Sequence, residues 1–290
     1  MRSIAIMNQK GGVGKTTTAV NLAAALADLG KTVCLIDLDP QAHASLHLGL
    51  ALSDDDPSVY EVLMGKLSLE DVRRRIGENL WIVPSHLDLA ASEMELAAEV
   101  GREVILRDRI AADGRSFDYL ILDCPPSLGV LTINALTAVS EIILPLQPHF
   151  LALHGLSKLL HTIEVVQQRL NAALHLQGVV LCMYDSGTRL AAEVSKDVET
   201  FFATHATEAH CWTNSRTFAT RIRRNIRLAE APSFGQSIFD YAARSHGAED
   251  YRSLAQEVLG SAIPEPARHA SAVSAADVAV AELTLSDLKV

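Results

Sequence analysis

Lys10-Gly11-Gly12-Val13-Gly14-Lys15-Thr16-Thr17 follows the apolar run Ile4-Ala5-Ile6-Met7 near the start of this 290-residue chain. A buried strand that breaks into glycines and then opens a helix is typical of a phosphate-binding loop. Glycines allow successive backbone N–H groups to turn toward an anion, and the following helix adds the positive end of its dipole. The stretch therefore predicts a nucleotide site, with Lys15 on the β- and γ-phosphates and the Thr16 hydroxyl on Mg²⁺.

The loop departs from the strict phosphate-loop pattern at one position. That pattern has glycine five residues before Gly14, where this chain has Gln9, and a second lysine, Lys10, stands beside it at the mouth of the loop. A glycine turn before an ordinary helix is the alternative interpretation. The preceding strand and the amphipathic helix that follows favour a nucleotide site instead.

Composition narrows the class of protein. Apolar residues make up 49% of the chain and aromatic residues 5%, so we expect a core of Ala, Val, Leu and Ile. The formal net charge is −10, which means that any contact with nucleic acid requires a local basic patch. The four cysteines form no Cys-x-x-Cys pair, so neither a structural zinc nor a disulfide framework is expected. We interpret the histidines as single surface or core residues.

The beginning of the chain predicts a cytoplasmic protein. It passes directly into the first strand, without the charged segment and apolar core of a signal peptide. A run of about 18 apolar residues, which a membrane span requires, is also missing from the sequence.

Strands and helices alternate along the chain. Thr16 to Leu29 carries alanines and leucines at helical spacing, and Gly30 stands where a helix stop is expected. Continuous apolar runs predict strands that are buried on both faces. The other strands are expected at 32–36, 80–83, 117–122, 142–146 and 178–183, and the other helices at 58–64, 68–75, 87–98, 102–112, 128–138, 153–170 and 190–202. This alternation predicts an α/β fold, a doubly wound, mostly parallel sheet flanked by helices.

Three aspartates follow predicted strands. Asp37 and Asp39 come after the strand at 32–36, and Asp123 follows the strand at 117–122. Ligands of such sheets bind at the carboxyl ends of the strands, where these carboxylates and the loop converge. We expect Asp123 to hold Mg²⁺ directly or through water, and one of Asp37 and Asp39 to orient the attacking water. Their separate roles stay open, because alternation puts both on one face of the strand.

The composition changes at Ile263. Pro264 and Pro266 precede residues that are mostly Ala, Ser and Val up to Val290. We therefore predict one nucleotide-binding domain over residues 1–261 and a flexible tail over residues 262–290.

Three motifs resemble the deviant Walker A, A′ and B motifs of ParA/Soj-type partition ATPases, within the wider family that includes MinD. They are Lys10-Gly-Gly-Val-Gly-Lys-Thr-Thr17, Asp37-Leu-Asp-Pro-Gln41 and Leu122-Asp-Cys-Pro-Pro126. The likeness continues through Met183-Tyr184-Asp185 and the segment 224–235, so that it extends from residue 2 to residue 260. It implies the P-loop NTPase fold and an ATP hydrolysis that is slow until a partner stimulates it.

The resemblance also implies roles for individual residues. Lys10 is similar to the family's signature lysine, which reaches the partner's phosphates in an ATP-sandwich dimer. Asp39 matches the residue that positions the hydrolytic water, and Asp37 matches a helper on the metal side. Asn225 matches an adenine-reading position, and Arg223 stands where the family usually has proline. The implied nucleotide-binding set is Lys10, Gly11, Gly12, Val13, Gly14, Lys15, Thr16, Thr17, Arg223 and Asn225. The implied catalytic set is Lys10, Lys15 and Asp39, and the implied metal set is Thr16, Asp37 and Asp123.

A basic segment is the candidate DNA contact. Residues 209–229 contain five arginines and no acidic residue. Arginines that neutralise phosphates give salt-sensitive binding without sequence preference. From charge alone, a solvated basic face or arginines turned toward the nucleotide explain the segment equally well, whereas the resemblance favours double-stranded DNA. Relatives often carry an arginine where this chain has Gly187, and Arg189 is a replacement two residues on. The predicted DNA-binding residues are Arg189, Arg216, Arg221, Arg224 and Arg227.

The resemblance further implies partners. We expect an ATP-dependent homodimer, non-specific double-stranded DNA and a ParB-like stimulating partner, at the nucleoid in the cytoplasm. Three alternatives stay open: a MinD-like ATPase on membranes, a related ATPase that positions a non-DNA cargo, and a metabolic P-loop ligase or reductase. Three acidic residues stand against one lysine in the segment 277–290, the wrong sign for anionic lipid, so we expect no stable membrane association. A reductase is disfavoured because Cys124 has no second cysteine in a glycine-rich setting.

Overall fold

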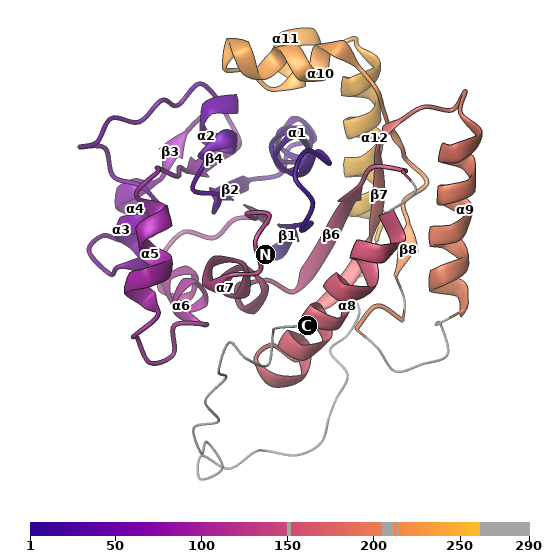
Figure 1. Ribbon diagram of the computed structural model, residues 1–290. Helices are drawn as coiled ribbons and strands as arrows, with labels where there is room; N and C mark the ends of the chain where they lie inside the picture. Colours follow the sequence, from indigo (N-terminus) through magenta and orange to yellow (C-terminus); the bar gives the residue numbers. More distant parts are fainter. Residues whose placement is uncertain (150–151, 205–210, 214, 262–290) are drawn as a thin grey trace.

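The computed structural model describes residues 1–149, 152–204, 211–213 and 215–261 (Figure 1). Within these ranges one sheet has the strand order β3-β4-β2-β5-β1-β6-β7-β8, and β9 also pairs with β7. The strands are β1 (Arg2–Ile6), β2 (Val33–Asp37), β3 (Arg74–Arg75), β4 (Leu80–Val83), β5 (Tyr119–Asp123), β6 (Glu141–Leu146), β7 (His175–Tyr184), β8 (Arg216–Thr217) and β9 (Ile222–Arg223). Of these, β3 runs antiparallel to β4, and the other described pairs are parallel. The predicted tail lies outside the described residues.

Helices connect and cover the strands. The longer helices are α1 (Lys15–Asp28), α5 (Leu89–Leu96), α6 (Ile105–Ala111), α7 (Val130–Ala138), α8 (Ala152–Arg169), α9 (Arg189–Thr204) and α12 (His246–Gly260). The shorter ones are α2 (His43–His47), α3 (Val59–Leu63), α4 (Leu69–Val72), α10 (Ile226–Glu230), the 3₁₀ helix η1 (Ala231–Phe234) and α11 (Ile238–Ala242). None of the helices in the described ranges is both long and apolar enough to cross a membrane.

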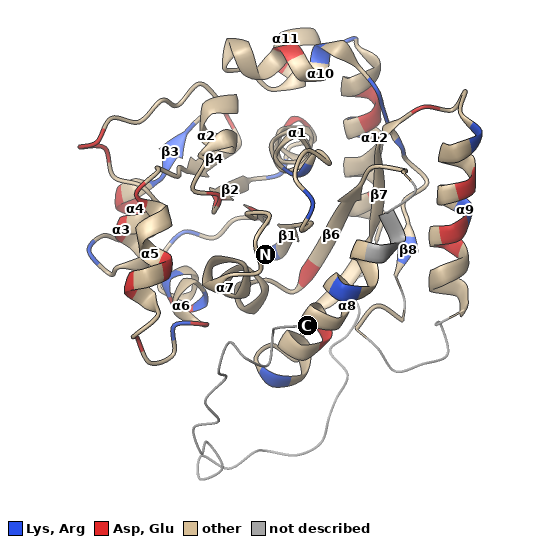
Figure 2. Cartoon of the chain, viewed as in Figure 1, with Lys and Arg blue, Asp and Glu red and all other residues tan. Residues whose placement is uncertain are grey.

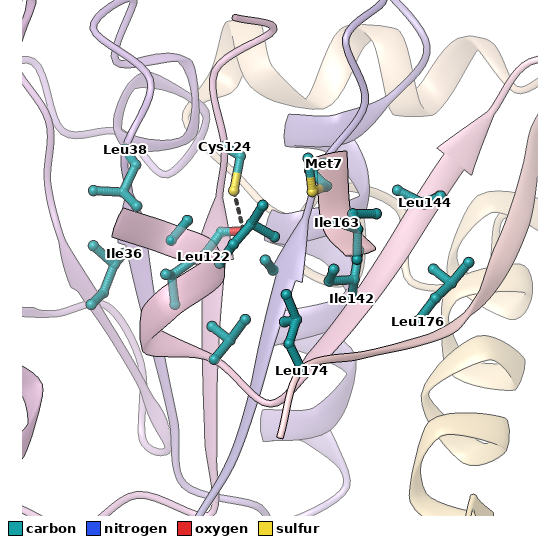
Figure 3. Close-up of a cluster of buried hydrophobic side chains, with 14 of the residues drawn as sticks. Met7, Ile36, Leu38, Leu122, Cys124, Ile142, Leu144, Ile163, Leu174 and Leu176 are labelled. Atoms are coloured by element: carbon teal, nitrogen blue, oxygen red, sulfur yellow. Dashed lines mark hydrogen bonds between the residues drawn. The ribbon is translucent and has the colours of Figure 1, made fainter. Parts of the chain in front are cut away.

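Alternation along the central strands creates two hydrophobic cores. Ile4 and Ile6 pack with α1 and α12 on one face of the sheet. Ala5 and Met7 pack with residues of α7 and α8 on the other face, and Figure 3 shows Met7, Leu122 and Ile142 in this second core. Because both faces are covered, the central strands are apolar over most of their length, with charged residues at their ends. The predicted doubly wound, mostly parallel α/β sheet is confirmed.

One predicted helix is wrong in its second half. The expected helix at 68–75 ends at Val72 as α4, and Arg74 and Arg75 form β3 at the sheet edge. Arg75 pairs with Trp81 across the antiparallel ladder, and its guanidinium carbon lies 5.5 Å from the centroid of a Trp81 ring. This antiparallel pairing with the next strand along the chain overrides the local helical pattern.

The register of the sheet brings the predicted site together. Asp37 of β2 and Ile6 of β1 are both register partners of Asp123, which ends the strand β5 between them. The loop that follows Ile6 therefore begins beside the two aspartates. The carboxyl ends of three adjacent strands form the floor of one site, as expected for this class of sheet.

The first strand is also tied to the last described helix. The Arg2 guanidinium donates two hydrogen bonds to the Glu141 carboxylate, of 2.8 and 2.6 Å, and one to the carbonyl of Val258 in α12. Both charged side chains are buried. Because a buried ion without its partner is costly, this cluster fixes α12 against β1 and β6.

Candidate functional site

The loop between β1 and α1 has the conformation of an anion cradle. Gly12 and Gly14 have φ angles of +73° and +96°, a left-handed conformation that glycine adopts without strain. The Gly14 carbonyl accepts the Thr18 N–H at 2.9 Å, and α1 begins at Lys15. The unpaired N–H groups at this helix start face an incoming anion. The predicted strand, loop and helix are thus present.

The two lysines of the loop lie in different surroundings. Lys15 is 7% exposed, and its Nζ donates to the Lys10 carbonyl at 3.1 Å. Burial lowers the pKa of Lys15, whereas the nearby Asp123 and Asp39 raise it. Lys10 is exposed, and its Nζ contacts Nε2 of His149 beyond the end of β6. Lys15 is therefore held inside the loop, and the Lys10 side chain lies outside it.

Asp123 is the carboxylate with the fewest protein partners at this site. It is fully buried, and among the described residues no normal hydrogen bond reaches either of its oxygens. Burial and Asp37 raise the pKa of Asp123 well above its ordinary value, while the nearby Thr16 hydroxyl lowers it. A buried unpaired carboxylate calls for a missing partner. Together with the Thr16 hydroxyl it fits Mg²⁺, which binds one or two protein oxygens and the phosphates of a nucleotide.

Asp37 and Asp39 have different surroundings. Asp37 is fully buried, and Ser45 donates to its Oδ2 from both Oγ (2.8 Å) and the backbone N–H (2.9 Å). Burial raises the pKa of Asp37 to about 6, against the hydrogen bonds from Ser45 and from the Asp39 N–H. Asp39 lines the nucleotide pocket, and its Oδ1 accepts the Gln41 N–H at 3.0 Å. Burial and hydrogen bonding thus distinguish two residues that alternation alone does not.

A pocket of about 840 Å³ extends from the loop to the segment around Asn225. Its volume suits a nucleotide. The Asn225 Oδ1 accepts the Arg227 N–H at 2.8 Å and caps α10, so the helix position depends on a pocket residue. Arg223 also lines the pocket, but its guanidinium is bound by Asp250 at 2.6 Å and by Glu249 at 3.2 Å. Hydrogen bonds to Asp250 raise the pKa of Arg223, and its charge is largely compensated within the chain.

Of the predicted DNA-binding arginines, Arg216 lies in the edge strand β8, Arg221 and Arg224 flank β9, and Arg189 and Arg227 belong to α9 and α10. Gly178 of β7 is the register partner of Arg216, and Tyr184 at the end of β7 is that of Arg223. Three of the predicted residues form ion pairs: Arg189 with Glu193 (2.9 Å), Arg221 with Glu199 (3.7 Å) and Arg227 with Glu230 (2.8 Å). Among the described residues, Arg216 and Arg224 have no ion pair of this kind. Figure 2 shows the acidic residues that α9 brings to this edge.

Two histidines of α2 have the spacing of metal ligands on a helix. His43 and His47 are four residues apart, a spacing that the interpretation of the histidines as single residues does not account for. The described part of the chain contains no group of three His, Cys, Asp or Glu side chains that could hold a metal ion. Burial lowers the pKa of His47 to about 4, so it is a neutral core residue.

The fold and the site define the class of protein. A Gly-Lys-Thr loop between the central strand and its helix, with a buried aspartate on the neighbouring strand, makes this chain a P-loop ATPase. Residues 1–176 match the family model described as an AAA domain. The sporulation initiation inhibitor protein Soj of Bacillus subtilis is 45% identical over 256 residues, 88% of this chain and 97% of that protein. The chromosome-partitioning ATPase Soj of Treponema pallidum is 42% identical over 259 residues, 89% of this chain and 97% of that protein.

A solved structure agrees in fold. Cobyrinic acid a,c-diamide synthase from Mycobacterium smegmatis, with a bound ATP analogue and magnesium, is 37% identical, with a TM-score of 0.75. The similarity covers 89% of this chain and 94% of that one. The chain described here belongs to the Soj/ParA family of partitioning ATPases.

Proposed function

We propose that this protein is a partitioning ATPase that dimerises around ATP and binds double-stranded DNA without sequence preference. Hydrolysis, stimulated by a ParB-like partner, ends the DNA-bound state and thereby moves a chromosome or plasmid. The names of its relatives, Soj and chromosome-partitioning ATPase, support this function over other uses of the same fold. It acts at the nucleoid.

The position of the Lys10 side chain is the observation that supports dimerisation around ATP. Its side chain is exposed and contacts His149, and it is not among the residues that line the described nucleotide pocket. A lysine at the mouth of a phosphate loop that does not serve its own loop is available to a second subunit. There it adds positive charge to the phosphates in a site that closes only on dimerisation.

Each remaining group has a task in phosphoryl transfer. Lys15 and the loop N–H groups bind and orient the phosphates, and Thr16 and Asp123 hold Mg²⁺, which neutralises charge on the phosphate oxygens. Asp39, whose carboxylate lies at the pocket, orients the attacking water. Asp37, the register partner of Asp123 on the neighbouring strand, supports it on the metal side. Asn225 and Arg223 border the base.

The edge of the sheet is the DNA-binding surface in this proposal. Arg216 and Arg224 lie about six strand residues apart along β7, or roughly 20 Å at about 3.3 Å per residue. Arginines spread over this length reach several phosphates of a duplex, which gives binding that weakens with salt. Arg189, Arg221 and Arg227 add charge once DNA competes with their carboxylates.

ATP turnover with and without DNA and partner, on the wild type and on Lys10→Ala, tests the proposal. The wild type should turn over slowly alone and faster with both additions. Lys10→Ala should bind ATP, stay monomeric in size-exclusion chromatography, and lose both stimulation and DNA retention. Fast turnover by a stable monomer would refute the dimer mechanism.

The likeness to the mycobacterial diamide synthase favours a second candidate, an ATP-dependent amide-forming ligase. The two candidates differ in their acceptor. A ligase consumes ATP in proportion to a carboxylic acid and ammonia or glutamine, whereas a partitioning ATPase responds to duplex DNA. Turnover measured with cobyrinic acid and glutamine, and separately with DNA, distinguishes them.

A further inference from the structure

Four polar residues from three segments form a closed ring beside the pocket. Asp37 ends β2, Asp39 follows it, Ser45 is in α2, and Ser85 lies two residues beyond β4. The Ser85 N–H donates to Ser45 Oγ (2.9 Å), and Ser45 Oγ–H donates to Asp37 Oδ2 (2.8 Å). The Asp39 N–H donates to Asp37 Oδ1 (3.2 Å), and Ser85 Oγ–H closes the ring on the Asp39 carbonyl (2.8 Å).

Three members of the ring are closed off from water, whereas the fourth, Asp39, is 7% exposed and lines the pocket. Ser45 and Asp37 are 0% exposed and Ser85 is 1% exposed. Neither serine is among the residues that line the nucleotide pocket. Buried hydrogen-bond networks in which each member has a partner fix a single arrangement. The two serines therefore act on the pocket only through what they hold in place.

The ring holds the turn that carries the Asp39 carboxylate. The Asp39 carbonyl accepts a second bond from the Ala42 N–H (2.9 Å), and Ala42 itself has a left-handed φ of +53°. On the other side of the turn, the Asp39 Oδ1 accepts the Gln41 N–H. The main chain of Asp39 is thus held on both sides and one carboxylate oxygen is bound, which restricts how this pocket-lining carboxylate can turn.

We propose that Ser85 is a positioning residue for ATP hydrolysis, and that Ser45 is its link to Asp37. Ser85 does not touch the nucleotide; it aims the Asp39 carboxylate by holding the Asp39 main chain. This inference rests on the proposed function, in which Asp39 orients the attacking water. Misplacement of such a group by about 1 Å costs on the order of 100-fold in rate, so a loosened ring should slow hydrolysis without weakening ATP binding.

The test compares Ser85→Ala with Ser92→Ala. Ser92 of α5 is a matched control because it is 0% exposed and its Oγ also donates to a main-chain carbonyl, that of Leu89 at 2.6 Å. We expect Ser85→Ala to lower kcat about five- to tenfold, with the Kd for ATP changed less than about twofold. Ser92→Ala should leave both values unchanged. Hydrolysis is measured at saturating Mg-ATP with linear duplex DNA, and thermal unfolding shows that both variants are folded.

A second set of variants tests whether Ser45 and Ser85 act through the same hydrogen-bonded ring. Ser45→Ala should lower kcat like Ser85→Ala, and the double variant should be no slower than the slower single variant, because both changes open the same ring. A kcat for Ser85→Ala equal to that of Ser92→Ala would overturn the proposal. Equal losses in kcat and in ATP affinity, or multiplicative effects in the double variant, would overturn it as well.

The variant Asp39→Ala distinguishes failure of the positioning role of Ser85 from failure of the proposed function on which that role rests. If Asp39→Ala abolishes hydrolysis while Ser85→Ala does not slow it, the positioning role fails and the proposed function stands. If Asp39→Ala hydrolyses ATP at the wild-type rate, the proposed role of Asp39 fails, and the positioning role fails with it.

Discussion

The nucleotide end of the sheet and its arginine edge are built in opposite ways. At the nucleotide end, Lys15, Asp37, Asp39 and Asp123 are at most 7% exposed, and strand register or main-chain hydrogen bonds fix each of them. At the edge, the side chains of Arg189, Arg221 and Arg227 are 92%, 39% and 54% exposed, and each has a carboxylate of the same chain beside it.

This difference predicts how each region responds to substitution. In the buried region no other side chain can replace a contact that is lost, so a single substitution should abolish an activity. On the exposed edge the charges are spread, screened and partly cancelled, so several changes are needed for a comparable loss. The expected effects therefore decrease from the phosphate loop to the ion pairs of the edge.

Lys15→Ala should produce the largest loss. Lys15 is the buried cation of the loop and, in the proposed function, binds the phosphates; removal of one such group costs about 100-fold or more. We expect ATP binding, measured with a fluorescent ATP analogue, and hydrolysis to fall by at least that factor. Lys66→Ala, which removes an exposed lysine stacked on Tyr60, should behave as wild type. If Lys15→Ala kept the wild-type affinity for ATP, the nucleotide end would not be more sensitive to a single substitution than the arginine edge, and the comparison would fail.

Combined reversal of Arg216, Arg224 and Arg227 to Glu should abolish ATP-dependent DNA retention. Each reversal removes one phosphate contact and adds repulsion, so at moderate salt we expect a loss of about 100-fold or more. Because Arg224 also lines the nucleotide pocket, ATP binding is measured on the double variant Arg216→Glu with Arg227→Glu, which leaves that lining unchanged and should keep ATP affinity within about twofold. Reversal of Arg75, Arg107 and Arg109, which are exposed on β3 and α6, keeps the same net charge and should preserve retention. Unchanged retention in the first variant would contradict the DNA surface.

Acid should destabilise the nucleotide end through His47. The folded pKa of His47 is about 4, and the unfolded pKa is about 6.5. Between these values the unfolded chain binds more protons, so this contribution is complete above about pH 6.5 and is lost as the pH falls toward 4. From pH 7 to pH 5 the wild type should lose about 2 kcal/mol more unfolding free energy than His47→Gln.

Urea unfolding at the two pH values measures this difference. His246→Gln is the control, because the His246 side chain is 70% exposed. It should follow the wild type. Equal pH dependence of His47→Gln and the wild type would mean that His47 is not kept neutral by burial.

Removal of the paired carboxylates should have the smallest effect, and in the opposite direction. Glu199→Gln with Glu230→Gln frees Arg221 and Arg227 from ion pairs that are exposed and therefore weak. We expect DNA to bind about two- to fivefold tighter in fluorescence anisotropy. Glu78→Gln with Glu95→Gln changes the net charge equally at sites away from this edge. An equal gain in that control would attribute the effect to net charge alone.

Much of the fold follows from local sequence patterns, because apolar runs and glycine stops act over a few residues. The strand at 80–83 and the loop-to-helix junction at Lys15 are placed as predicted. The strand β3 does not follow from such patterns, since its two arginines continue a helical spacing and become a strand only through antiparallel pairing with β4. Local patterns also do not reveal the short helix α2, whose His43 and His47 have no strong apolar period.

The candidate site likewise contains residues that local sequence patterns predict and residues that they do not. The glycine loop, Lys15 and the three aspartates are visible as motifs, because phosphate chemistry requires those residue types at that spacing. Ser85 is invisible at this level, since it is 46 residues from Asp39 and meets it only in the folded chain. The carboxylates that pair with the edge arginines belong to α9 and to the last residue of α10. All of them lie outside the basic segment 209–229, so that segment alone does not reveal the ion pairs. The nucleotide and DNA roles of Arg223, Asn225 and the edge arginines stay predictions.

The position of β1 has a consequence for the synthesis of the protein. This strand is made before the other elements of the described fold, yet its Arg2 bonds to Glu141, 139 residues later, and to Val258, 256 residues later. At about 5–20 residues per second, the strand waits roughly 10–50 s for its last partner. The neighbouring strands β5 and β6 are made earlier, so β1 can already pair within the sheet, but the face that α12 covers stays exposed, and Asn225 and Tyr251 have not yet joined the pocket. ATP binding by a nascent chain therefore has to wait until nearly the whole domain has been made.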